Sequence, residues 1–168
     1  MFSESALKEL EKHVGLEVMA SMSYLYFSNF CRARNLDKYA DLFWEWSKEE
    51  LEHAHKMLDY LGDLGRSAGL SISGQIDPEG MGEPGTLKVC LERSVSIEKA
   101  VGENIMRIHK MALEDGDASL VHFLREFALL IPKEINEKET HLQRVVELGE
   151  RLADDLLGEF LEKIEGKD

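Results

Sequence analysis

Four long segments of this chain carry apolar residues at the spacing of an α-helix, and this pattern restricts the possible folds more than any other feature. They cover residues 3–33, 37–64, 86–114 and 118–148. Each is long enough for about eight turns at 3.6 residues per turn. The chain has 168 residues and three prolines. We therefore predict an all-α protein that forms a single domain over residues 1–168.

The connections between the segments predict how the helices are arranged. Residues 34–36 and 115–117 are short enough only for tight turns, so the helices that they join should be antiparallel neighbours. Residues 66–85 are rich in glycine and contain Pro78 and Pro84, which excludes a regular element there. We expect this long connection to cross the length of an antiparallel four-helix bundle, so that the second and third helices run parallel.

Local signals refine this outline. Ser3 and Thr86 are candidate N-caps, and Gly65 suits the end of the second helix. Pro132 lies inside the fourth segment, where it removes a backbone hydrogen bond at a cost of about 3 kcal/mol, and we predict a kink near residues 128–132. Residues 153–164 form a short fifth amphipathic helix, which we expect to pack at an end of the bundle or against a neighbouring subunit.

Each long helix also has acidic side chains halfway along its apolar side. They are Glu17 in the first, Glu50 with His53 in the second, Glu98 in the third, and Glu134 with Glu137 in the fourth. In a four-helix bundle the midpoints lie at one level, so these groups should meet in a dry interior, where they could not all be ionised without a cation. Carboxylates with one imidazole favour iron, manganese or zinc. We predict a di-iron site in which Glu50 bridges two metals.

The alternatives to a metal site are structural. A single inward glutamate is more often a misjudged helix phase than a ligand, and His53 alone would more often be a packed core residue; the metal prediction depends on the complete set. Tyr24 lies two turns from Glu17 and is either a hydrogen-bond donor to a ligand carboxylate or an ordinary core tyrosine. Glu49 faces away and could serve an auxiliary iron site. We interpret the histidines other than His53 and His141 as surface residues: His13, His55, His109 and His122.

Charge and composition exclude several partners. The net charge is −13, which argues against binding to nucleic acid or to an anionic membrane. No apolar run approaches the roughly 20 residues that span a bilayer, and the first residues do not form a secretion signal. Cys31 and Cys90 form no disulfide framework, which favours a reducing compartment. We expect a cytoplasmic protein.

With these residues in these positions, the sequence resembles the ferritins, specifically the haem-free bacterial and archaeal type. The resemblance covers nearly the whole chain and is carried by Leu16-Glu17 with Tyr24, by residues 49–53, by Ile97-Glu98 and by the short final helix. It implies that Glu17, Glu50 and His53 hold one iron, and that Glu50, Glu98 and a residue of the fourth helix hold the second. It also implies ferroxidase activity with O2 or H2O2 as the oxidant, and storage of Fe(III) mineral in a hollow shell of twenty-four identical subunits.

The fourth helix is where the sequence departs from that family. The family usually has Gln or Glu and then Glu three residues later, and Glu134 with Glu137 fits this spacing; we favour this pair as ligands. An alignment without a gap from Phe123 instead places Ile131 and Glu134 in those roles. His141 is a further candidate near the site.

Two features speak against haem and against the related bacterioferritins. Leu51 stands where their haem-binding methionine follows the bridging glutamate, and Lys138 stands three residues before His141, where they have Glu-x-x-His. The main alternative function is a non-storage di-iron oxidase or peroxidase like the rubrerythrins, although the chain has no CxxC pair for an electron-transfer centre. A third alternative is a helical bundle that has lost its metal.

Overall fold

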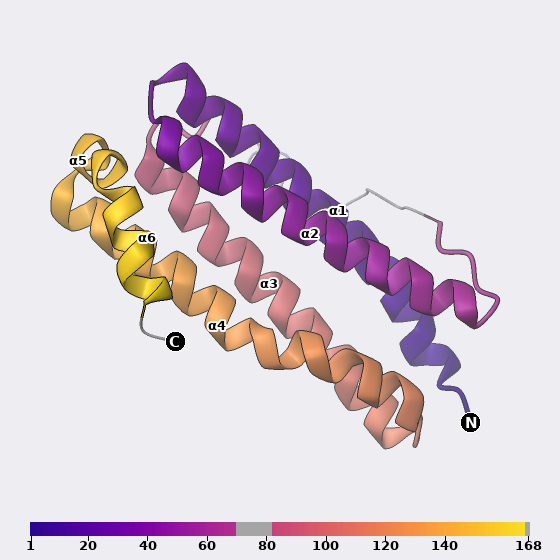
Figure 1. The fold of residues 1–168 in the computed structure, drawn as a ribbon. Coiled ribbons are helices and arrows are strands. Elements are labelled where there is room, and N and C mark those ends of the chain that lie inside the picture. Colours follow the sequence, from indigo (N-terminus) through magenta and orange to yellow (C-terminus); the bar gives the residue numbers. More distant parts are fainter. Residues whose placement is uncertain (70–81, 167–168) are drawn as a thin grey trace.

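The computed structural model describes residues 1–69 and 82–166, and the regular structure in these ranges is entirely helical (Figure 1). Its elements are α1 (Glu4–Ala33), α2 (Asp37–Asp63), α3 (Leu87–Glu114), α4 (Ala118–Leu148), α5 (Glu150–Asp155) and α6 (Leu157–Glu165). The predicted all-α fold is confirmed. Ser3 and Thr86 cap α1 and α3 by accepting hydrogen bonds from the backbone N–H groups of Ala6 and Val89.

Contacts near the ends of the helices establish their directions. The backbone N–H of Ser3, just before α1, donates to Asp117 Oδ2 in the turn between α3 and α4, at 2.8 Å. Arg66, just after α2, donates to Glu11 of α1 at 2.6 Å. The C-terminal ends of α2 and α3 therefore lie at the same end of the bundle as the start of α1, which makes α2 and α3 parallel, as the long crossover predicts. Residues 70–81 of that crossover lie outside the described residues.

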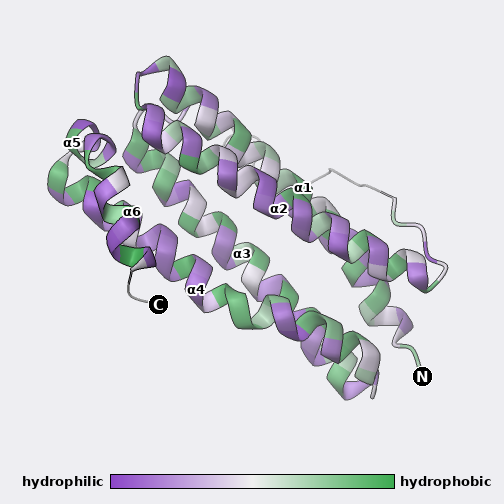
Figure 2. Ribbon diagram, in the orientation of Figure 1, coloured by the Kyte–Doolittle hydropathy of each residue, from purple (hydrophilic) through white to green (hydrophobic). Residues whose placement is uncertain are grey.

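A layer of carboxylates divides the apolar core into two clusters. One cluster contains the C-terminal half of α1 and the start of α2, with Phe27, Phe43 and Trp46 among its largest side chains. The other lies towards the start of α1 and the end of α2, with Leu10, Met57 and similar residues. Figure 2 shows hydrophobic and hydrophilic residues alternating along each long helix, as amphipathic helices require. The helices therefore place their mid-length polar residues between two dry regions.

The C-terminal segment differs from its prediction. Instead of one helix over 153–164, it begins directly after Gly149 and breaks at Leu156 into α5 and α6. Gly149 has φ of 78°, a conformation that glycine adopts without strain, and this lets the chain turn sharply at the end of α4. Ala153 and Leu157 are buried against the bundle, and the Arg144 guanidinium lies 3.9 Å from the centre of the Phe160 ring. In this chain the segment packs at one end of its own bundle.

Pro132 lies inside α4, which continues as one helix on both sides of it. The predicted kink there stays a prediction. A close helix contact lies beside this proline: a Cβ built on Gly102 of α3 would be 2.6 Å from Cγ2 of Ile131 in α4. Among the described residues, no helix is long and apolar enough to cross a membrane.

Candidate metal centre

Five side chains from the four long helices meet at the middle of the bundle. They form two groups, Glu17–Glu50–His53 and Glu50–Glu98–Glu134, and in each group one ligand atom per residue lies within 4.8 Å of the others. Glu50 belongs to both groups. These are the residues that the mid-helix pattern singles out, apart from Glu137. The arrangement gives two adjacent places for a cation, with one carboxylate between them.

The first group has a carboxylate oxygen that lacks a partner. Glu17 is 1% exposed, and its Oε2 accepts no hydrogen bond from any residue that the structure describes. His53 Nδ1 lies 3.5 Å from Glu50 Oε2 and 3.9 Å from Glu17 Oε2. An unsatisfied buried carboxylate oxygen costs free energy, and a cation placed among these atoms would remove that cost. The donor set of two carboxylates and one imidazole fits iron.

His13 corrects the sequence interpretation, because it is buried rather than at the surface. Its Nε2 lies 3.0 Å from Glu17 Oε1, and its Nδ1 accepts a hydrogen bond from Asn104 Nδ2 at 2.7 Å. The ring proton of the neutral imidazole must then be on Nε2, so that it donates to Glu17. His13 lies one helical turn before Glu17, and this i,i+4 spacing is the signal in the sequence that could have identified it.

The second group is organised around Glu98. The Tyr24 hydroxyl donates to Glu98 Oε1 at 2.6 Å, which is the first of the two predicted roles of Tyr24. Glu134 is less buried than Glu98, and His53 Nε2 lies 4.0 Å from its Oε1, so the imidazole stands between the two groups. Tyr24 thus orients a carboxylate of this group from the neighbouring helix α1.

Lys138 is a second residue near this centre, after His13, that the sequence pattern did not single out. It is 1% exposed, and its Nζ lies 3.4 Å from Glu98 Oε1. The same Nζ lies 4.3 Å from the centre of the Trp46 ring. Burial lowers the pKa of Lys138, but Glu98 and neighbouring carboxylates outweigh this, so the pKa lies above its usual value. Lys138 follows Glu134 by four residues, and this spacing places it on the same side of α4.

The fourth helix follows the ungapped alignment. Glu134 lies in the second group, and Ile131 packs against Gly102. Glu137, the favoured partner of Glu134, belongs to neither group; its Oε1 accepts a hydrogen bond from Trp46 Nε1 at 3.1 Å. The sequence preference for Glu137 therefore needs correction, because Glu137 points along α4 towards the aromatic cluster.

His141 and Glu49 also lie outside the two groups. His141 is buried, and its Nδ1 is 3.1 Å from the Tyr39 hydroxyl. Glu49 is exposed, as predicted, and an auxiliary site there stays a prediction.

The pKa shifts show that the carboxylates of the centre cannot all be ionised without added positive charge. Burial raises the pKa of Glu50 well above its usual value, and burial together with Glu98 raises the pKa of Glu134 to about 7. Burial lowers the pKa of His53, but contacts with Glu17 and Glu50 outweigh this and raise it to about 11. Burial would raise the pKa of Glu17, yet His13 and His53 keep it below its usual value. Without a metal, protons therefore supply the missing positive charge.

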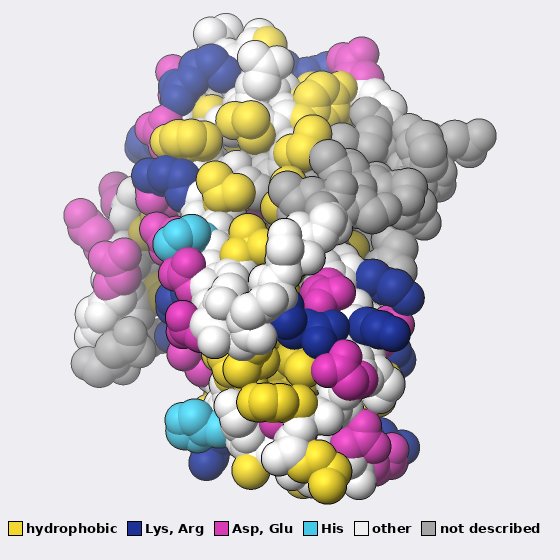
Figure 3. Space-filling view, turned by 90° about the vertical axis from the view of Figure 1, so that its right-hand side faces the viewer, with side chains coloured by type: hydrophobic (Ala, Val, Ile, Leu, Met, Phe, Trp, Pro, Cys, Tyr) yellow, Lys and Arg dark blue, Asp and Glu magenta, His cyan; other side chains and the backbone are white. Residues whose placement is uncertain are grey.

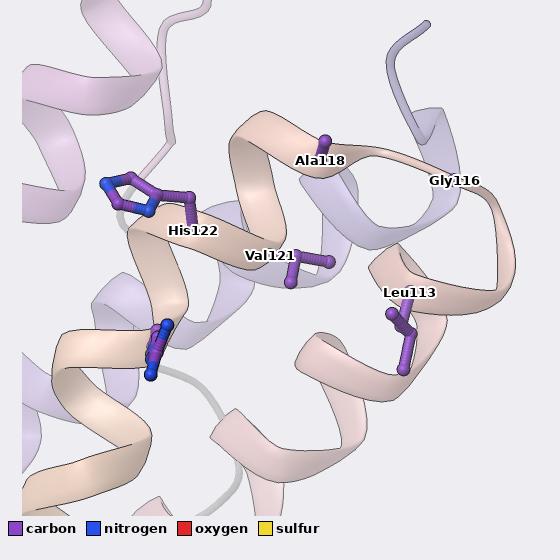
Figure 4. Close-up of a pocket in the computed structure, with 6 residues that line it drawn as sticks. Leu113, Gly116, Ala118, Val121 and His122 are labelled. Carbon is purple, nitrogen blue, oxygen red and sulfur yellow. The ribbon is translucent and has the colours of Figure 1, made fainter.

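A surface pocket at the turn between α3 and α4 is unrelated to this centre (Figure 4). It is lined by Leu113, Gly116, Ala118, Val121, His122 and Arg125. None of these residues is acidic, and the walls are mainly apolar. It offers no set of metal ligands, so the buried centre is the candidate functional site.

Comparison with known proteins identifies the family of this chain. The ferritin-like domain family matches residues 7–165. This chain belongs to the ferritin family. A bacterial non-heme ferritin from Staphylococcus epidermidis is 26% identical over 150 residues, covering 89% of this chain and 88% of the relative. A bacterial non-heme ferritin from Staphylococcus aureus is 25% identical over 152 residues, again covering 89% and 88%.

Solved ferritin structures have the same fold. An engineered closed form of the Archaeoglobus fulgidus ferritin superimposes with a TM-score of 0.82 at 22% identity, covering 97% of this chain and 95% of that chain. The Chlorobium tepidum ferritin has a TM-score of 0.79 at 24% identity, covering 98% of both chains. At these identities the structures establish the shared fold, and the arrangement of side chains must be argued from this chain itself.

Proposed function

We propose that this ferritin takes up Fe(II) as its substrate, oxidises it at the centre around Glu50, and stores the Fe(III) as a mineral inside a hollow shell. The observation that carries the proposal is the pair of three-residue groups that share Glu50. Membership of the ferritin family supports iron storage as the general role. The unpartnered Glu17 Oε2 supports cation binding in this particular chain.

The residues have distinct roles in this proposal. Glu17 and His53 hold the first iron, Glu98 and Glu134 hold the second, and Glu50 lies between them. Each Fe(II) gives up one electron, so a pair of ions supplies the two electrons that, with two protons from the solvent, convert O2 to H2O2 or H2O2 to two waters. Tyr24 fixes Glu98 by its hydrogen bond, and His13 fixes Glu17. Protons held by Glu50 and Glu134 leave as the metals enter.

Storage requires an assembly, and the surface of the single chain supports one. Large hydrophobic side chains reach the surface, among them Leu25, Leu51, Leu129 and Val146, which are 50–68% exposed. Figure 3 shows that on one face such side chains lie among charged ones. Extensive exposed apolar surface is typical of subunit contacts. We propose a homo-oligomeric cage of twenty-four subunits in the cytoplasm.

Aerobic addition of Fe(II) to the purified assembly tests the catalytic part. We expect the wild-type protein to form ferric iron much faster than buffer alone, and Glu50→Gln to bring the rate close to that of buffer. Glu103→Gln removes an exposed carboxylate from α3 and should behave like the wild type. Equal rates for the wild type and Glu50→Gln would refute oxidation at this centre.

Native mass spectrometry and electron microscopy test the storage part. We expect a large hollow particle that gains an electron-dense iron core. A stable monomer or dimer with rapid, Glu50-dependent oxidation would instead identify a non-storage di-iron oxidase or peroxidase.

A further inference from the structure

The ammonium group of Lys138 is the feature of the centre that metal binding does not explain. Lysine is rarely fully buried, because removing an ammonium ion from water is costly unless other groups compensate. Lys138 is 1% exposed, and it enters the centre from α4, one turn beyond Glu134. Since it carries no acceptor and a positive charge, it cannot act as a metal ligand in this state.

The contacts of Lys138 are confined to one side of the centre. Its Nζ lies 3.4 Å from Glu98 Oε1, the same oxygen that accepts the Tyr24 hydrogen bond. The ring of Trp46 lies at 4.3 Å and gives the ammonium a further favourable contact. Glu98 belongs only to the second group. Among the described residues, Lys138 forms an ion pair with Glu98 alone.

No lysine or arginine that the structure describes forms an ion pair with the first group. The groups that contact Glu17 are the imidazoles of His13 and His53, and His53 is itself one of the three residues of the first group. The ammonium of Lys138, in contrast, belongs to neither group and lies 3.4 Å from Glu98 Oε1. With the four carboxylates ionised, Lys138 changes the net charge of the centre from −4 to −3, so one divalent ion leaves −1 and a second gives +1.

We propose that Lys138 makes the two metal positions unequal: divalent metal binds tightly at Glu17–Glu50–His53, and weakly and reversibly at Glu50–Glu98–Glu134, because Lys138 already supplies a positive charge there. The inference rests on the proposed function and deepens it. Lys138 thereby determines the order of loading, and the second position is the one from which iron is released most easily. It is a positioning and charge-balancing residue, which acts through Glu98 and does not itself bind iron.

Binding of redox-inert divalent ions tests this inference without relying on oxidation. The assembled protein is titrated with Co(II) and with Zn²⁺ by calorimetry, and the visible bands of Co(II) report each ligand set. We expect two steps per subunit in the wild type, with dissociation constants at least tenfold apart. Glu134→Gln should remove the weak step and retain the tight one, which assigns the weak step to the second group.

Variants of Lys138 then test its charge. Lys138→Met keeps the length of the side chain without its charge, and we expect the weak step to tighten roughly ten- to hundredfold while the tight step stays unchanged, a range comparable to other effects of residues behind metal ligands. Lys138→Arg keeps the charge and should keep the two steps apart. Lys110→Met removes one exposed lysine charge from α3 as a matched control and should leave both steps as in the wild type. Thermal unfolding and native mass of each variant confirm folding and assembly, and Lys138→Gln replaces the methionine variant if that variant does not fold.

Three results would overturn the inference: steps of equal affinity in the wild type, a weak step that survives Glu134→Gln, or a weak step that neither neutral variant tightens. These results leave the proposed function standing as long as Glu50→Gln abolishes binding. If the wild type binds no Co(II) in a Glu50-dependent manner, the proposed function itself fails.

Discussion

The two halves of the candidate centre share Glu50, but different groups compensate the negative charge of the carboxylates in each half. In the half formed by Glu17 and His53, the neighbouring groups are imidazoles, and one carboxylate oxygen is left without a partner. In the half formed by Glu98 and Glu134, a tyrosine hydroxyl and a lysine ammonium already occupy one carboxylate oxygen. The first half is therefore prepared to accept a cation, whereas the second half is partly neutralised before any metal arrives.

This difference shows that similar ligand lists do not imply similar sites. Both groups contain buried carboxylates on long helices, but metal affinity also depends on the charges and hydrogen bonds behind them. A buried ion pair such as Lys138–Glu98 is a poor source of stability, because desolvation offsets its attraction. Its position in the middle of a helical bundle is better explained by an effect on what binds beside it.

The largest predicted effect comes from the residue that both halves share. Glu50→Gln should abolish both steps of Co(II) binding and reduce the rate of Fe(II) oxidation by a hundredfold or more, an estimate above the roughly 10–100-fold typical of residues behind ligands. Glu98→Gln should remove only the weak step. Calorimetric stoichiometry measures this contrast directly. Loss of both steps in Glu98→Gln would mean that the two halves are not separable.

The sequence predicts the first half fully and the second only in part, for a physical reason. Glu17, Glu50 and His53 lie on helices joined by a three-residue turn, so their relative register is nearly determined by the chain. α3 and α4 are joined by an equally short turn, but two registers of α4 one helical turn apart each bring a pair of residues to the acidic layer, and close contacts such as Gly102 with Ile131 select one of them. The spacing of three residues fits Glu134–Glu137 and Ile131–Glu134 equally well. Only the packing of α4 determines which pair lies at the acidic layer.

The residues that contact the candidate ligands were harder to predict than the candidate ligands themselves. A histidine or lysine on a helix is usually at the surface, so His13 and Lys138 carried no signal when considered singly. Each lies four residues from an inward glutamate, and this is the pattern that identifies them once the glutamates are assigned. The division of the C-terminal segment at Leu156 depends on docking against the bundle, which its own periodicity does not encode.

His13 provides the next test, confined to the first half. His13→Ala removes the hydrogen bond to Glu17 Oε1 and should weaken the tight step of Co(II) binding about 10–100-fold, with the weak step unchanged. His13→Gln can donate to Glu17 through its amide and should restore much of the affinity. Calorimetry on the three proteins measures both steps. Equal weakening of both steps would indicate a general loss of structure instead.

Gly102 tests the packing that brings α4 to the second half. An alanine Cβ would lie 2.6 Å from Ile131 Cγ2, and a β-branched side chain in a helix has little rotamer freedom to move away. Gly102→Ala should therefore lower the free energy of unfolding by about 1–3 kcal/mol, as measured by urea denaturation. Gly62→Ala is the matched control, because nothing lies within 4 Å of its added methyl group and alanine favours a helix by up to about 1 kcal/mol. If Gly102→Ala is as stable as this control, the close contact does not restrain α4.

The pH dependence of stability separates the charged centre from the apolar region next to it. In the metal-free protein, the acidic partners of His53 raise its pKa from 6.5 to about 11, whereas burial lowers the pKa of His141 to about 3. Stability that depends on His53 is therefore fully present below pH 6.5 and is lost as the pH rises towards 11. Stability that depends on neutral His141 is present above pH 6.5 and is lost as the pH falls towards 3, by at most about 1.4 kcal/mol per pH unit for one proton.

Urea unfolding in the presence of a chelator measures how the free energy of unfolding changes with pH in each of the two ranges. The stability difference between the wild type and His53→Gln should shrink as the pH rises above 6.5, and the difference between the wild type and His141→Phe should shrink as the pH falls below 6.5. These opposite signs arise because the two histidines belong to environments of opposite character: His53 lies among carboxylates, and His141 packs edge-on against Trp46 and Phe160. If both differences changed in the same direction with pH, the negative potential of the centre would extend along α4 as far as His141.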